Sequence, residues 1–507
     1  MGAMWIDALI MIVYLGVMVG SGLWSRSRPK TDTDYFLGSR NMPWPTAALS
    51  IVATETSTLT VISLPAVAYG GAMLFMQLTI GYLLGRILVA WLMLPAYFEG
   101  TQDTAYSYLA ARFGDRVKGA AASTFIITRL LADGVRLFAT AIPLRVLLLM
   151  FGIEVGFAPL IVAIALVTLA YTLTGGLRAV MWMDVWQLLL YIVGGLATLW
   201  VITSGSEGWS SVMLTLDEAA KRVWLDLHMP SLNYILTQPY AFGTAVLGGA
   251  VFSMASHGTD HLIVQRLLST GTLASARKAL VSSGVLVMLQ SLLFLYVGAL
   301  LWVEYAGASA TALGLSRADA IFPKFILEGL PTGLRGLLIA GIFAAAMSTL
   351  SSSLNSLAST TRYDLLPLVR PGAGQDVGLR QAQWITVFWT VIMVGFASMF
   401  TNEQNPVVEL GLAIATFTYG GLLGLFAVGR LVPRLQGSDA IGVLILTILT
   451  LTFLIKGLYF DPSGGWAVGL DRPSAAKTLA WPWYTLVGTA ASVIYGWVWG
   501  RLRPPRS

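Results

Sequence analysis

The sequence predicts an all-α integral membrane protein with about 13 transmembrane helices. Three observations lead to this fold class: 56% of the residues are hydrophobic, only 11% are charged, and the mean hydropathy over 507 residues is +0.74. A soluble globular core cannot absorb so large an apolar share. We therefore expect a multi-pass protein of the plasma (inner) membrane whose main partner is the lipid bilayer.

Apolar segments of spanning length recur along the chain. Each is close to the roughly 20 residues that cross a bilayer core as a helix. We place them at 4–24, 45–70, 73–97, 119–150, 156–174, 182–204, 239–258, 280–304, 335–361, 381–401, 407–429, 438–456 and 478–500. We expect 1–507 to form a single transmembrane domain, with 4–24 as a peripheral N-terminal helix and 438–500 as two peripheral C-terminal helices.

The basic residues favour one orientation. With the N-terminus outside, nineteen Lys and Arg fall in cytoplasmic segments and eight in outer loops. The positive-inside rule then predicts an outside N-terminus and a cytoplasmic C-terminus. The same scatter among short loops explains the pI of about 9.4 without a nucleic-acid partner.

Two segments are poorly suited to continuous helices. The second span, SIVATETSTLTVISLPAVAYGG at 50–71, gathers hydroxyl residues around Glu55 and follows them with Pro65. The seventh span is interrupted by Gly243, Gly248 and Gly249. Broken helices at corresponding places in two five-helix halves are typical of inverted-repeat transporters. The predicted repeats are 45–204 and 239–429.

A ladder of hydroxyls marks the ninth span. The stretch AAAMSTLSSSLNS at 344–356 carries uncharged oxygens where an ordinary membrane helix carries Leu and Val. Such oxygens can exchange for the hydration shell of a hard, weakly bound monovalent cation. We therefore interpret the segment as half of a sodium site in a transporter.

The motif around the sixth span resembles a known family. Tyr171–Ala179 reads YTLTGGLRA and is followed by Val180, Trp182, Asp184 and Gln187. Together with the hydroxyl ladder and the VQR at 264–266, this resembles the sodium:solute symporters, which include sodium/glucose, sodium/proline and sodium/pantothenate carriers. The resemblance implies a LeuT-type 5+5 inverted repeat with two broken helices, and Na+ as the coupling ion.

The resemblance also implies the ligands of a main sodium site. These are the carbonyls of Ala53 and Thr56, the carbonyl of Ala345, and the hydroxyls of Ser348 and Thr349. The i, i+3, i+4 spacing places the last three on one helical face. The alternative is that the hydroxyls only bond i−4 carbonyls or join helix interfaces.

A second sodium site is an open question. In some family members an acid at the position of Asp184 joins hydroxyls of the ninth span, which here would be Ser348, Ser351 and Ser352. An ionisable residue inside the membrane is usually functional. The alternative is an acid near the end of its span, bonded to Arg178 or to solvent. One or two sodium ions per cycle are both compatible with the sequence.

Several polar intramembrane residues are candidates for solute binding. Arg129 and Arg136 stand four residues before and three residues after Asp133, so one acid serves two cations. Arg136 then either takes a solute carboxylate bidentately or pairs with Glu55 across the bundle. We expect Asp260 and Gln265 near the inner end, as a cytoplasmic gate. The predicted solute-binding residues are Glu55, Ser57, Thr60, Gln77, Arg136, Ser253 and His257.

The function predicted from these features is sodium-coupled symport of a small polar organic solute by alternating access. A carboxylate-bearing metabolite fits the arginines, a sugar fits the hydroxyl-rich second span, and an amino acid could use Glu55 and Arg136 together. Proton coupling and a membrane sensor that reuses the carrier fold are alternatives. An enzyme is disfavoured, because three His, no Cys and no HExxH pattern offer no catalytic constellation. The oligomeric state is open.

Overall fold

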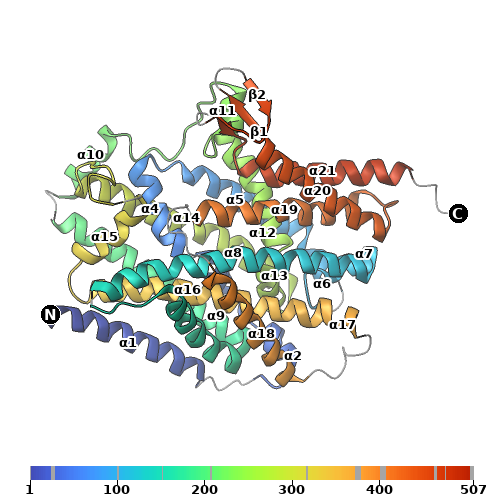
Figure 1. Cartoon of the computed structure of the whole chain (residues 1–507), viewed down its shortest axis with the longest axis horizontal. Coiled ribbons are helices and arrows are strands. Elements are labelled where there is room, and N and C mark those ends of the chain that lie inside the picture. Colours follow the sequence, from blue (N-terminus) through green and yellow to red (C-terminus); the bar gives the residue numbers. More distant parts are fainter. Residues whose placement is uncertain are drawn as a thin grey trace.

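The computed structural model describes residues 2–23, 29–56, 58–99, 102–150, 152–205, 208–315, 318–370, 378–399, 407–461, 465–473 and 476–502. Within these ranges the chain is a bundle of helices, most of them running along the long axis of the molecule (Figure 1). The helices of the first half are α1 (Gly2–Leu23), α2 (Asp32–Leu37), η1 (Gly38–Arg40), α3 (Trp44–Glu55), α4 (Thr58–Gly70), α5 (Phe75–Leu92), α6 (Leu94–Phe98), α7 (Ser107–Phe113), α8 (Asp115–Met150), α9 (Phe157–Gly205), α10 (Trp209–Glu218) and α11 (Leu232–Thr237).

The second half is also helical, apart from one small sheet. Its elements are η2 (Thr244–Gly248), α12 (Gly249–Gly258), α13 (His261–Leu268), α14 (Leu273–Glu304), η3 (Ala318–Ala320), α15 (Ile321–Glu328), α16 (Leu334–Thr360), η4 (Thr361–Leu365), α17 (Leu366–Val369), α18 (Leu379–Ser398), α19 (Val407–Leu431), α20 (Gly437–Gly457), β1 (Leu458–Asp461), β2 (Gly465–Val468), β3 (Lys477–Thr478) and α21 (Pro482–Leu502). Strand β1 pairs antiparallel with both β2 and β3.

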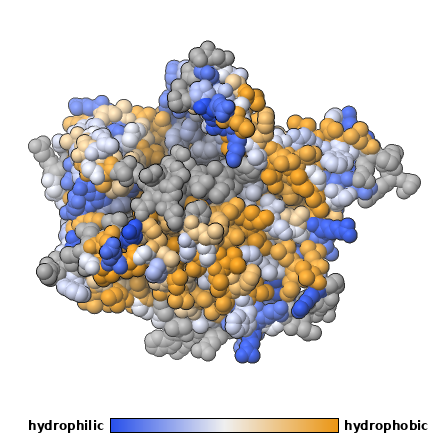
Figure 2. Space-filling model, in the orientation of Figure 1, coloured by the Kyte–Doolittle hydropathy of each residue, from blue (hydrophilic) through white to orange (hydrophobic). Residues whose placement is uncertain are grey.

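The lengths and compositions of these helices agree with a multi-pass membrane protein. Among the described residues, five helices are long and apolar enough to cross a bilayer, and a sixth counts if α3 and α4 form one bent span. Large apolar side chains such as Trp91, Trp200 and Val391 are more than 60% exposed, as lipid-facing residues are. Figure 2 shows a broad hydrophobic area over the bundle, with hydrophilic residues around the small sheet and beyond α7. The predicted total of about 13 spans stays a prediction.

The second predicted span is broken. Helix α3 ends at Glu55, and the axis of the following segment, Thr60–Gly70, is bent from it by 63°. Thr56 is the C-cap, with φ −79° and ψ 90°. The crowding of β-branched and polar residues that disfavours a regular helix therefore coincides with an interruption in the middle of the membrane segment.

The interruption near the seventh predicted span, 239–258, comes just after that span and not at its glycines. Gly243, Gly248 and Gly249 keep helical backbone angles, and the interruption comes at Thr259 and Asp260, between α12 and α13. Asp260 is the N-cap of α13, where its carboxylate accepts the amide of Leu262 at 3.0 Å. The capping carboxylate stabilises the start of a new helix at this position, which explains the break better than the glycines do.

The glycines instead allow close packing. A Cβ on Gly81 of α5 would lie 2.6 Å from the carbonyl oxygen of Ala245, and one on Gly85 would overlap the carbonyl oxygen of Ala250. Gly248 lies against the backbone of Pro482. Small residues let helix backbones approach, and α5 and α12 therefore touch backbone to backbone.

The Gly-Gly pair of the sequence motif makes a turn between two spans. Gly176 has φ +55° and ψ −154°, which divides α9 into two arms. A Cβ there would lie 2.5 Å from the carbonyl oxygen of Tyr35 in α2. Gly176 is required both by its positive φ and by the close approach of α2.

Candidate functional site

The break in the second span brings helix-end carbonyls into the bundle. The last carbonyls of a helix have no partner within it, and Ala53 and Thr56 lie at this end of α3. Both residues are buried. The hydroxyl of Thr56 donates to the carbonyl of Val52 at 2.7 Å and pairs with the amide of Gln290 on α14. The broken end is thus held by a hydrogen bond to a neighbouring helix.

The hydroxyl ladder lies on α16, which is buried along nearly its whole length. The hydroxyl of Thr349 donates to the carbonyl of Ala345, four residues earlier in the same helix, at 3.1 Å, which is the i−4 bond of the alternative interpretation. The hydroxyl of Ser348 donates to Asp184 Oδ1 at 2.6 Å, which leaves its lone pairs as acceptors. Helix α16 contacts α3 where Ser352 Oγ lies 3.4 Å from Thr54 Oγ1. The two helices of the predicted main sodium site are therefore neighbours.

Asp184 is paired with Arg266, a residue that the sequence did not assign to it. Nη2 of Arg266 lies 3.0 Å from Asp184 Oδ2, and neither side chain is exposed. Arg266 also donates to the hydroxyls of Ser50 and Ser352 and to a carbonyl of α13. Ser351 donates to the carbonyl of Ser348 at 3.1 Å. A guanidinium, rather than Arg178 or solvent, balances this carboxylate.

Glu55 is the partly exposed centre of a second charge cluster, in which Arg86 and His257 are buried. Its Oε2 lies 2.5 Å from Nη2 of Arg86 on α5, and its Oε1 lies 2.8 Å from Nε2 of His257 on α12. The other terminal nitrogen of Arg86, Nη1, donates a hydrogen bond to the hydroxyl of Ser283 at 2.9 Å. In this structure the cation that pairs with Glu55 is therefore Arg86, and the expected alternative of an ion pair with Arg136 is not formed.

Asp133 of α8 forms ion pairs with both Arg129 and Arg136, as the i, i+4 and i, i+3 spacings predict. Asp133 contacts Arg129 at 3.4 Å and Arg136 at 3.0 Å. Arg129 also binds Asp260, the cap of α13, and the hydroxyl of Tyr419 on α19. Asp260 therefore supplies the second negative charge that the sequence left unassigned. It joins α8, α13 and α19.

The other predicted solute-binding residues are distributed more widely. Ser253 lies one turn before His257, but its hydroxyl donates to the carbonyl of Tyr82 at 2.9 Å. Gln77 binds the backbone of the segment between α10 and η2, through the carbonyl of Tyr240 and the amide of Asp226. Thr60 is half-buried on α4, and Ser57 lies outside the described residues.

Gln265, predicted to lie at a cytoplasmic gate, crosslinks three elements. Its side-chain amide donates to the carbonyl of Phe36 in α2 at 2.8 Å and to Asn355 of α16 at 2.7 Å. Near it, His261 lies 3.1 Å from the hydroxyl of Ser359. Residues 259–266 are therefore bound to α2, α8 and α16 at once.

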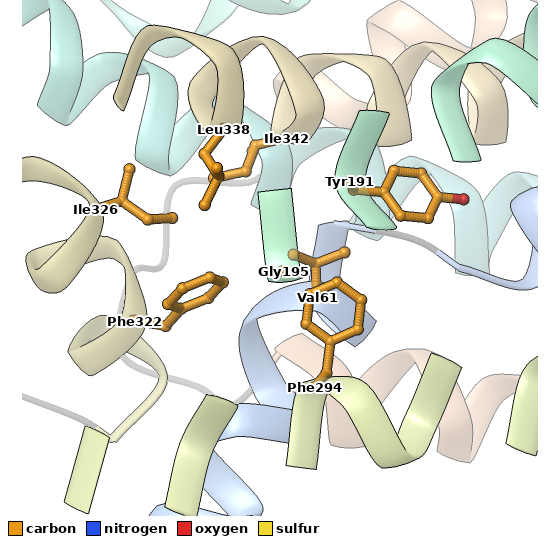
Figure 3. A pocket seen from close by; sticks show the side chains of 8 residues that line it. All are labelled: Val61, Tyr191, Gly195, Phe294, Phe322, Ile326, Leu338 and Ile342. Atoms are coloured by element: carbon orange, nitrogen blue, oxygen red, sulfur yellow. The ribbon is translucent and has the colours of Figure 1, made fainter. Parts of the chain in front are cut away.

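A small apolar pocket lies apart from these polar clusters. Figure 3 shows side chains of α15 and α16 on one side, with Phe294 of α14 opposite them. The hydroxyl of Tyr191 points away from the space. The lining residues are Val61, Tyr191, Gly195, Phe294, Phe322, Ile326, Leu338 and Ile342. Because it lacks convergent polar groups, this pocket is a poor candidate for a polar solute.

Sequence reasoning missed Arg86, Arg266, Ser50 and Gln290. Each of these residues is a polar residue within a largely apolar helix. That contrast was the sequence signal that could have identified them. Their partners lie far along the chain: Arg86 is 31 residues from Glu55, and Gln290 is 234 residues from Thr56. Pairings of this kind depend on how each helix is rotated about its axis.

Comparison with known proteins identifies the family of the chain. The family model described as the sodium:solute symporter family matches residues 35–446. The chain is 28% identical to a putative sodium-dependent multivitamin transporter of Drosophila melanogaster, over 87% of this chain and 73% of that protein. It is 26% identical to human sodium-coupled monocarboxylate transporter 2, over 94% and 76%, and 28% identical to the sodium/sialic acid symporter SiaT of Proteus mirabilis, over 88% and 89%.

Solved structures show the same fold. A substrate-bound, outward-open Na+-coupled sialic acid symporter, described as revealing a novel Na+-site, superposes with a TM-score of 0.80 at 26% identity and covers 99% of both chains. Mhp1, a nucleobase-cation-symport-1 family transporter, superposes at 0.52 with 14% identity over 96% of this chain and 98% of that one, which bears on the fold alone. The broken second span, the hydroxyl-rich α16 and the family match agree, and the chain belongs to the sodium:solute symporter family.

Proposed function

We propose that this sodium-coupled symporter carries a small carboxylate-bearing solute, and that Arg136 binds the carboxylate. The observation that carries the proposal is the exposure of the arginines inside the bundle. The side chains of Arg86 and Arg266 are 0% exposed and that of Arg129 is 8% exposed, whereas that of Arg136 is 23% exposed. A planar guanidinium that keeps an open side can bind a carboxylate through two parallel hydrogen bonds.

The names of two relatives support the same class of solute. One is a monocarboxylate transporter and the other a sialic acid symporter, so both carry an acid. The identities to these two relatives are 26% and 28%. The charge arrangement of this chain therefore carries the proposal, and the names are secondary support.

The proposed main sodium site consists of the carbonyls of Ala53, Thr56 and Ala345 with the hydroxyls of Ser348 and Thr349. Five neutral oxygens can hold sodium without trapping it. The helix break at the end of α3 and the contact of α3 with α16 support this assignment. Sodium bound between α3 and α16 would stabilise the state that takes up solute, and low internal sodium would favour release.

A second sodium ion could bind at Asp184, Ser351 and Ser352 only after a rearrangement of Arg266. Both oxygens of Asp184 are already hydrogen bonded, and Arg266 lies against Asp184 and Ser352. Arg266 would have to withdraw before a second cation could bind there, because two cations on one buried carboxylate repel each other. We therefore propose that one sodium ion is transported with each solute molecule as long as Arg266 stays paired with Asp184.

An amino acid is the second candidate solute. The side chain of Glu55 is 24% exposed, although Arg86 beside it is fully buried. A carboxylate that keeps an open side at the helix break could accept hydrogen bonds from a solute ammonium group, while Arg136 binds the solute carboxylate. His257 and Ser253 on α12, together with Ser57, Thr60 and Gln77, complete the proposed solute-binding residues.

We also propose the orientation and the internal repeats. Asp7, near the start of α1, binds the amides of Gly333 and Gly336 and the side chain of Arg335, so the start of α1 lies beside the start of α16. The asymmetry of basic residues assigns this end to the outside. The C-terminus would then be cytoplasmic, with 45–204 and 239–429 as the two repeats.

The test is thermal stability of the detergent-purified protein in sodium, potassium or choline, with paired solutes added. Each pair is a carboxylic acid and its neutral amide, with glycine-type amino acids and sugars as further classes. A solute at about 100 times its dissociation constant should add about 2.7 kcal/mol of stability. We expect the acids, and not the amides, to raise the melting temperature in sodium, and we expect Arg136→Gln to abolish that increase. Equal effects of acid and amide would exclude the carboxylate proposal.

A further inference from the structure

Asp133 is a buried carboxylate that connects two functional regions. It lies on α8 with only 2% of its surface exposed. Its Oδ1 accepts Arg136 at 3.0 Å, and its Oδ2 accepts the hydroxyl of Ser353 at 2.5 Å. Arg129 approaches the same Oδ2 at 3.4 Å. The carboxylate of Asp133 thus binds two arginines of its own helix, α8, and one serine of α16.

Ser353 belongs to the same helix as the proposed sodium ligands. It follows Thr349 by four residues, which places it one turn further along the same face of α16. Ser353 is fully buried, as are Ser348 and Asp133. A displacement of α16 on sodium binding would therefore be passed to Asp133 through a short, dry hydrogen bond.

We propose that Asp133 is a positioning residue through which sodium binding on α16 sets the orientation of Arg136. This inference rests on the proposed role of Arg136 in solute binding. Ser353 donates a hydrogen bond to one oxygen of Asp133, and Arg136 donates to the other. The position of the Arg136 guanidinium therefore depends on the position of α16. Arg129 contributes less to this link, because it is also bound to Asp260 and Tyr419.

The geometry explains why the link would affect solute binding. Bidentate recognition of a carboxylate requires the plane of the guanidinium to match that of its ligand. An Arg136 side chain that is partly exposed and has no fixed partner would sample many rotamers and bind a carboxylate more weakly. Coupling between two sites is reciprocal, so a change at Arg136 must also alter sodium affinity. This reciprocity allows a test with sodium as the only ligand.

The experiment is a double-mutant cycle between Ser353 and Arg136. The quantity measured is the sodium concentration that gives half of the maximal thermal stabilisation. In the wild-type background we expect Arg136→Gln to shift this concentration by about fivefold, the lower end of typical coupling factors. In the Ser353→Ala background we expect the same substitution to produce no shift.

Matched variants separate the link from general damage. Ser356 is also a buried serine of α16, but within the described part of the chain its hydroxyl donates to the carbonyl of Ser353 on its own helix and to no other helix. Ser356→Ala should leave the effect of Arg136→Gln intact, and Ser353→Thr, which keeps a hydroxyl, should restore it. Asp133 itself is left unchanged, because its loss would strand two arginines.

Each outcome decides the question. An equal sodium shift from Arg136→Gln in the wild-type and Ser353→Ala backgrounds would overturn the proposal, and so would the absence of any shift in the wild type. A failure of the carboxylate panel would exclude the proposed solute class but would leave the cycle readable, since the cycle uses sodium alone. A wild-type protein that does not distinguish sodium from potassium would contradict sodium coupling itself.

Discussion

The carboxylate of Asp184 and the guanidinium of Arg266 lie 3.0 Å apart with neither side chain exposed to solvent. The pair joins α9 to α13, and Ser50 and Ser348 complete its hydrogen bonds. Removing one member of such a pair leaves an uncompensated charge in a medium of low dielectric constant. We therefore expect the loss of one member of the pair to reduce stability more than the replacement of both members.

Arg266→Gln should destabilise the protein by about 3–5 kcal/mol, because it strands Asp184. The double variant Asp184→Asn/Arg266→Gln should be more stable than Arg266→Gln alone. Unfolding in detergent, followed by a tryptophan signal, measures both. Strictly additive losses in the double variant would contradict a direct pair.

The double substitution Ser348→Ala/Thr349→Ala should raise the sodium concentration for half-maximal uptake by about tenfold or more. It removes two of five proposed ligands, and each 1.4 kcal/mol of lost binding energy is a factor of ten. Sodium-dependent uptake into proteoliposomes measures this concentration. Ser356→Ala, on the same helix but outside the proposed site, should leave it unchanged. A double variant with unaltered sodium dependence would remove the assigned site.

Gly176→Ala should destabilise the turn between the two arms of α9. The residue has a positive φ, and the added methyl group would meet the carbonyl oxygen of Tyr35. We expect a loss of at least about 1 kcal/mol, the usual cost of backbone strain at such a position. Gly16→Ala in α1 is the control, because a Cβ there has no neighbour within 4 Å. Melting temperatures of the two variants would test the difference.

Asp260→Asn should change transport rates more than it changes expression. Asparagine can still cap α13, but it loses the charge that binds Arg129 of α8. Asp217→Asn is the control, because Asp217 forms an exposed pair with Arg222, and exposed pairs contribute only about 0–1 kcal/mol. Exchange and net uptake rates in proteoliposomes measure the effect. Unchanged rates would remove Asp260 from any gating role.

The membrane class, the break of the second span and the hydroxyl face of α16 could all be predicted from local sequence. Each depends on composition or on spacing along one helix. The Gly-Gly motif also has a local cause, the turn at Gly176. Local patterns were informative because membrane-spanning helices are predominantly apolar. A stretch of polar or hydroxyl residues within one therefore stands out in the sequence.

The partners of the buried charges could not be predicted in the same way. Glu55 pairs with Arg86 and His257, which lie on two other helices. Choosing among several arginines requires the rotation and depth of each helix, and no spacing rule encodes them. The break of the seventh span was misplaced for a related reason: glycine serves helix packing at Gly248 and Gly249, whereas the cap at Asp260 causes the interruption.

The close contact of α5 with α12 offers an internal standard for measuring motion. Because Gly81 and Gly85 leave no gap between the two backbones, we expect these helices to move through the transport cycle as one rigid piece. The chain contains no cysteine, so spin labels can be attached at chosen positions without background. Labels at Leu84 of α5 and at Leu247 of η2, which leads directly into α12, are 43% and 57% exposed and should report a constant distance in every state. Distances from this pair to α16 would then reveal which helices move against it.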